Sequence, residues 1–114
     1  MTKDEFDVAL TQSPVKPVFR THVGDRELFV ADGYVPPQHL KYLDRFGMPA
    51  TPDEYPFGCF ATIWYCESRI GLCGIVLCDA SHDPGHSQEA KAHMRILTAV
   101  EMARRDISRR QKMH

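Results

Sequence analysis

Alternation of apolar and polar residues predicts two β-hairpins in this chain. In the first, residues 17–23 and 26–35 alternate on either side of Gly24, and glycine suits the positive φ angle of a tight hairpin turn. In the second, residues 59–66 and 72–78 are apolar at both alternating sets of positions. Because a strand that is apolar on both faces is covered on both faces, we expect helices or a second subunit over this hairpin.

Helical spacing of apolar residues predicts three further segments. A capping pattern at Thr2 opens a helix over residues 3–11, a second helix follows over 37–47, and the longest runs from about Pro84 to Arg110. The resulting order is α-ββ-α-ββ-α. We therefore expect residues 1–114 to form one α+β domain with a mostly antiparallel four-stranded sheet packed with helices.

The apolar face of the long C-terminal helix is predicted from its periodicity. Asp83-Pro84 suits the start of the helix, with aspartate as the N-cap and proline in the first turn. The side chains expected to face the core are His86, Ala90, His93, Leu97, Val100 and Ile107, with Ile96 and Ala103 beside them.

Charge is distributed unevenly along the chain, although the net charge is only −1. Residues 1–58 carry nine acidic and six basic side chains, and residues 59–90 carry four and one, so each segment has a charge of −3. Residues 91–114 carry seven basic and two acidic side chains, a charge of +5. The predicted protein is therefore an acidic body with a basic terminal helix.

The basic end of the chain has three interpretations. Its cations are Arg104, Arg105, Arg109, Arg110 and Lys112. Basic side chains in the last turns of a helix complement the helix dipole, and this alone accounts for some of them. The same cluster suits an acidic protein surface, or nucleic acid as a less favoured alternative, because dedicated nucleic-acid binders are usually basic overall and this chain is not.

The segment "LCDASHDPGH", Leu77 to His86, contains the residues most suggestive of chemistry. Turn and capping roles explain its aspartates, serine, proline and glycine. A thiol and three imidazoles remain, and these are ligand types that zinc accepts: Cys78, His82, His86 and His93. We expect no metal and no cofactor, and keep as the alternative a zinc-binding or thiol-dependent enzyme centred on these four residues.

The sequence contains no signature of an enzyme family. The four cysteines match no CxxC pattern, and no G-x-S-x-G, G-x-G-x-x-G or Walker-type loop is present. The N-terminal residues do not form a secretory signal, and no apolar run is long enough to span a bilayer, so we expect a cytoplasmic protein with reduced thiols and no membrane partner. A non-enzymatic role is favoured.

The aromatic residues of the second hairpin supply a candidate contact surface. If three helices leave part of the sheet uncovered, Trp64 and Tyr65 would be exposed, and a homodimer would be one way to cover them. We therefore expect a small protein-binding module that uses its basic helix and aromatic hairpin. Its size suits an accessory or inhibitor protein, of which phage- or plasmid-borne anti-defence proteins are one instance.

Overall fold

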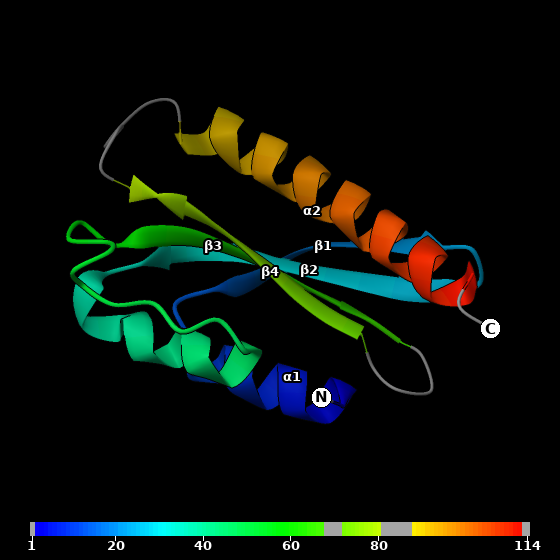
Figure 1. Cartoon of the computed structure of the whole chain (residues 1–114), viewed down its shortest axis with the longest axis horizontal. Coiled ribbons are helices and arrows are strands. Elements are labelled where there is room, and N and C mark those ends of the chain that lie inside the picture. Colours follow the sequence, from blue (N-terminus) through cyan, green and yellow to red (C-terminus); the bar gives the residue numbers. More distant parts are fainter. Residues whose placement is uncertain (1, 68–71, 81–87, 113–114) are drawn as a thin grey trace.

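The computed structural model describes residues 2–67, 72–80 and 88–112. Four strands form one antiparallel sheet in the order β1-β2-β3-β4, and helices pack on both of its faces (Figure 1). The α+β class, the antiparallel four-stranded sheet and the long C-terminal helix on it are as the sequence predicted. In Figure 1, α2 (Gln88–Lys112) lies above the sheet, and α1 (Lys3–Thr11) and η1 (Pro37–Phe46) lie below it.

The first half of the chain forms the elements that its residue pattern favours. Thr2 caps α1, because its hydroxyl oxygen accepts a hydrogen bond from the backbone N–H of Glu5 at 3.1 Å. Strands β1 (Lys16–Val23) and β2 (Arg26–Val35) pair around Gly24, whose φ of 66° is the positive value expected of the turn.

The second helical segment, η1, is a 3-10 helix and not an α-helix. Leu40, Leu43 and Phe46 are three residues apart, which matches the three residues per turn of a 3-10 helix, and all three are buried. Gly47, with a φ of 80°, ends the helix in the left-handed conformation.

Strand β3 of the apolar second hairpin is covered on both faces, whereas β4 is only partly covered. Strands β3 (Cys59–Cys66) and β4 (Leu72–Asp79) pair antiparallel, and β3 lies between β2 and β4. One face carries a core shared with α1 and η1, which includes Phe6, Leu40 and Ile63. The opposite face carries a second core under α2, which includes Leu28 and Ile107.

The aromatic part of the predicted contact surface is corrected by the structure. Trp64 and Tyr65 are each only 4% exposed: Trp64 belongs to the core under α2, and Tyr65 to the core on the opposite face. Tyr65 stacks on Phe6 of α1 with ring centroids 5.3 Å apart. The helices on the two faces of the sheet cover these rings, so neither ring is available to a partner.

The buried face of α2 matches the prediction at Val100, Ala103 and Ile107 and differs from it elsewhere. Ala99, Val100, Ala103 and Ile107 are buried, but Leu97 is 50% exposed. His93 is also exposed, so it is not the core histidine that the periodicity suggested. In its place the buried face carries Arg95, which is 9% exposed. The predicted start of this helix at Asp83-Pro84, together with His86, lies outside the described residues, and the side chain of Ala90 is not described.

Candidate functional site: the outer surface of α2

The exposed side of α2 carries both cations and large apolar side chains. We call this the outer α2 surface and define it by its exposed side chains: Met94, Leu97, Glu101, Met102, Arg104, Arg105, Ser108 and Arg109. None of these residues contributes to the two hydrophobic cores. The fold therefore leaves their side chains free to meet another molecule.

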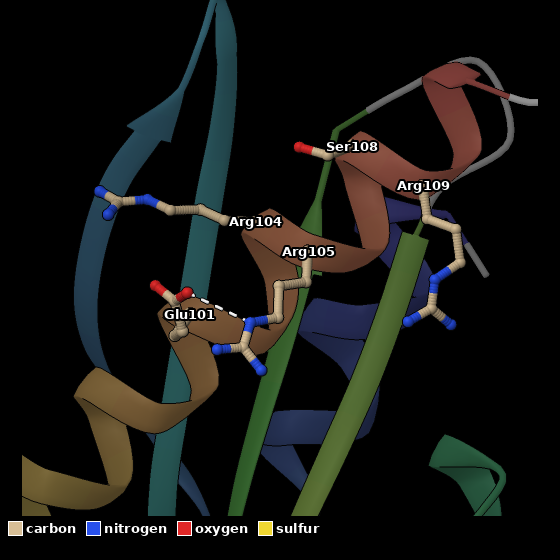
Figure 2. Close-up of a pocket in the computed structure, with 5 residues that line it drawn as sticks. All are labelled: Glu101, Arg104, Arg105, Ser108 and Arg109. Carbon is tan, nitrogen blue, oxygen red and sulfur yellow. Dashed lines mark hydrogen bonds and ion pairs between the residues drawn. The ribbon is translucent and has the colours of Figure 1, made fainter.

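The arginines gather around a shallow hollow in the second half of the helix. Figure 2 shows Arg104 and Arg109 extending to opposite sides, with Glu101 and Arg105 between them. Arg105 donates from Nε to Oε1 of Glu101 at 3.2 Å, an i,i+4 contact between two exposed side chains. Within the described part of the chain, neither Arg104 nor Arg109 forms a hydrogen bond or an ion pair. Two guanidinium groups thus keep their full capacity to bind an anionic group.

Apolar side chains share this surface with the cations. Met94 is 62% exposed, Leu97 50% and Met102 45%, and these three lie toward the N-terminal side of the arginines. Methionine adapts its shape to different partners, and arginine is enriched among the residues that dominate binding energy at protein interfaces. The combination is typical of a protein-binding surface.

Of the five predicted basic contact residues, three can be placed. Arg104, Arg105 and Arg109 are brought together on the outer α2 surface. Arg110 and Lys112 belong to the last turn of α2, but their side chains are not described. The exposed Met94, Leu97 and Met102 were missed by the sequence argument, which assigned Leu97 to the core.

The helix is held in place by an ion pair that the sequence analysis also missed. On the sheet side of α2, Arg95 donates from Nε and Nη2 to the two carboxylate oxygens of Asp32 on β2, at 2.9 Å and 2.8 Å. Asp32 also accepts a hydrogen bond from the Thr62 hydroxyl at 2.7 Å, and the Arg95 guanidinium lies 4.5 Å from the Phe60 ring centroid. Both charged side chains are less than a tenth exposed. This network fixes how α2 is rotated on the sheet.

The four candidate zinc ligands are only partly described. Cys78 near the end of β4 and His93 on α2 are both exposed, whereas His82 and His86 lie outside the described residues. The described residues contain no group of three or more histidine, cysteine, aspartate or glutamate side chains arranged to hold a metal ion.

Three of the four thiols, two of them buried and that of Cys73 partly buried, are poorly suited to nucleophilic chemistry. Burial, reinforced by the nearby Asp79 and Cys78, raises the pKa of Cys59 to about 11. Burial likewise raises the pKa of Cys73 to about 11, and it raises that of Cys66. Since the thiolate is the nucleophile, these three cysteines stay protonated and unreactive near neutral pH.

Comparisons with known proteins found no match among family models, curated proteins or solved structures. No helix of the described residues is long and apolar enough to cross a membrane.

Proposed function

We propose that this protein is a binding module of the accessory or inhibitor type, and that the outer α2 surface contacts a partner protein with an acidic surface. The observation that carries the proposal is the pair of exposed guanidinium groups of Arg104 and Arg109, which have no hydrogen-bond or ion-pair partner among the described residues and lie on a helix face outside both hydrophobic cores. Carboxylates on a partner would receive two hydrogen bonds from each planar guanidinium group.

The apolar half of the surface supports a protein partner over nucleic acid. Removing the side chains of Met94, Leu97 and Met102 from water is favourable, and an apolar patch on a protein partner would remove them from water. A phosphate backbone has no apolar surface that could bury these three side chains. The acidic charge of residues 1–90 also disfavours a polyanion that extends beyond the helix.

Helix-dipole complementation explains only part of the arginine cluster. The dipole acts within the last turn of a helix, and α2 extends to Lys112. Arg104 and Arg105 lie about two turns before this end, where the effect of the dipole is small. Arg105 pairs with Glu101, but neither this pair nor the dipole accounts for Arg104, for which an acidic protein surface would supply a partner.

Affinity capture from extract of the native host, treated with nuclease, tests this function. The charge-reversal variant Arg105→Glu/Arg109→Glu is compared with the wild-type protein and with Lys41→Glu/Arg45→Glu, which makes the same change in net charge on η1, across the sheet. We expect the α2 variant alone to lose a captured protein, and that protein, once purified, to bind the wild-type chain at least tenfold more tightly than the α2 variant. All three proteins should have similar melting temperatures.

Equal capture by all three proteins would contradict the proposal. A labelled DNA duplex serves as the second arm, titrated over a salt series. Tight binding of the duplex that weakens steeply with salt and is lost in the α2 variant would assign the surface to nucleic acid instead.

A further inference from the structure

The outer edge of β4 is the most apolar strand edge of the sheet. The order β1-β2-β3-β4 places β1 and β4 at the two edges, so within the described residues no strand pairs with the outer side of β4. From Leu72 to Cys78 this strand contains no charged residue and no proline. An unprotected edge of this kind is a template for pairing with another chain.

The opposite edge, β1, has the features that prevent such pairing. It contains Lys16, Pro17, Arg20 and His22, and its register with β2 shifts between Pro17 and Phe19. Charged side chains, proline and irregular register all disfavour edge-to-edge association. The two edges of one sheet thus differ, and β4 alone is suited to pairing.

Side chains on β4 are incompletely covered by the fold. Cys73, Ile75 and Leu77 pack at the margin of the core shared with α1 and η1 but remain partly exposed, and so does Val76. A further strand beside β4 would cover these side chains while it satisfied the outward backbone groups.

We propose that β4 pairs antiparallel with β4 of a second copy, so that the two four-stranded sheets become one sheet of eight strands. The pairing is isologous: a two-fold axis perpendicular to the sheet places the same residues of both copies in the interface. The antiparallel direction also sets the two Asp79 carboxylates at opposite ends of the paired segment, whereas a parallel pair would place these like charges side by side.

The side wall of the molecule is large enough for a dimer of moderate stability. Eight residues of β4 extend along about 26 Å of edge. Figure 1 shows the helix and sheet layers stacked along the 26 Å axis of the molecule. A wall of these dimensions has an area of roughly 700 Å², an upper limit for the area buried on each copy, against roughly 800 Å² per partner in a standard interface. We therefore expect a dimer that dissociates on dilution.

The two-fold symmetry places the outer α2 surfaces of both copies on the same side of the dimer. A two-fold axis perpendicular to the sheet keeps each face of the sheet on its own side. Both α2 helices then lie on the same face of the eight-stranded sheet, and their arginines face the same direction. If the proposed function holds, the dimer presents two binding surfaces to one partner assembly, which strengthens binding through avidity.

Sedimentation velocity of the full chain under reducing conditions, over a dilution series, tests the dimer. We expect the mass to rise from 13.0 kDa at low concentration toward twice that value at high concentration. Val76→Lys places two lysines close to the two-fold axis at the centre of β4, and Cys78→Lys adds a charge near each end of the paired segment. Both variants should remain monomeric with a wild-type circular dichroism spectrum. Val18→Lys, at an exposed position of the other edge, should dimerise like the wild type.

Hydrogen exchange of the wild-type protein supplies a measurement that needs no variant. Backbone amides of β4 should exchange more slowly in the concentrated sample than in the dilute one, whereas those of β1 should not change. A monomer at every concentration, a mass beyond the dimer, or loss of the dimer in Val18→Lys alone would overturn the inference.

Discussion

The guanidinium group of Arg95 and the carboxylate of Asp32 form two parallel hydrogen bonds between α2 and β2, in the buried layer between helix and sheet. This pair connects segments that are far apart in the chain and leaves no acceptor atom of Asp32 unused, because Thr62 donates to the same carboxylate. It fixes which side of α2 meets the sheet, and hence which side presents the arginines.

Removing one partner of this pair should be strongly destabilising. In Arg95→Met the carboxylate of Asp32 stays buried without its cation, and we expect the free energy of unfolding to fall by about 3–5 kcal/mol. Urea denaturation followed by circular dichroism measures this change.

Replacing the whole network should cost much less. The triple variant Asp32→Val/Thr62→Val/Arg95→Met leaves neither a buried charge nor an unsatisfied hydroxyl, so most of the lost stability should return. A loss below about 1 kcal/mol in the single Arg95→Met variant, where about 3–5 kcal/mol is expected, would show that the pair does not hold the helix.

The observed rotation of α2 is tested by two substitutions one helical turn or less apart. Ala99→Leu adds volume to a fully buried site and should destabilise the protein by about 1–3 kcal/mol. Leu97→Gln, at a half-exposed site, should change stability by no more than about 0.5 kcal/mol. If thermal or urea unfolding showed a larger loss of stability for Leu97→Gln than for Ala99→Leu, the buried face of α2 would be the one predicted from the sequence.

Sequence periodicity was sufficient to predict the helices and strands, but not which face of α2 packs on the sheet. Leu40, Leu43 and Phe46 are buried because their three-residue spacing places them on one face of η1. On α2, periodicity placed Leu97 in the core and did not include Arg95 among the residues that face it. It could not foresee that Asp32, on a distant strand, would draw Arg95 inward, because single-chain periodicity contains no information on pairing across 63 positions.

The basic residues of the candidate site could be predicted from the sequence, but its exposed apolar residues could not. Arg104, Arg105 and Arg109 stand out as a cluster in sequence and remain one in the structure. Trp64 was misassigned because its burial depends on a neighbour without a side chain. An added Cβ at Gly74 would lie 2.2 Å from the Trp64 ring, so the indole occupies the space that this glycine leaves.

The Trp64–Gly74 contact gives a third prediction. In Gly74→Ala the indole must move from its place over β4, and we expect a loss of about 1–3 kcal/mol in the free energy of unfolding. Since Trp64 is the single tryptophan, its fluorescence should report the displacement directly. Gly74→Ala should cost less in a Trp64→Phe background, and an equal cost in both backgrounds would contradict the steric explanation.

Thiol reactivity separates Cys78 from the other three cysteines. Cys78 is exposed, whereas burial raises the pKa of Cys59, Cys66 and Cys73. With the native protein, a thiol reagent such as DTNB should label one cysteine rapidly and the rest only on unfolding. Rapid labelling should disappear in Cys78→Ser. Rapid labelling of more than one site would contradict the described burial.

Alkaline pH should weaken the fold through the buried thiols. The pKa of Cys59 and that of Cys73 are raised from 9.0 to about 11, so the folded state retains protons that the unfolded chain releases. The free energy of unfolding should therefore fall as pH rises from about 9 toward 11 and should not depend on these groups below that window. Urea titrations of wild type and Cys59→Ala across this range should show a shallower pH dependence in the variant.

The most direct test of the proposed function is an NMR map of the partner's contact surface. A ¹⁵N-labelled sample of the full chain is titrated with the captured partner, once that protein has been purified. We expect the largest amide shift changes in α2 between Met94 and Arg109, little change in η1, and loss of these changes in Arg105→Glu/Arg109→Glu. Shift changes centred on α1 and η1, with α2 unaffected, would contradict the assignment of the outer α2 surface as the binding site.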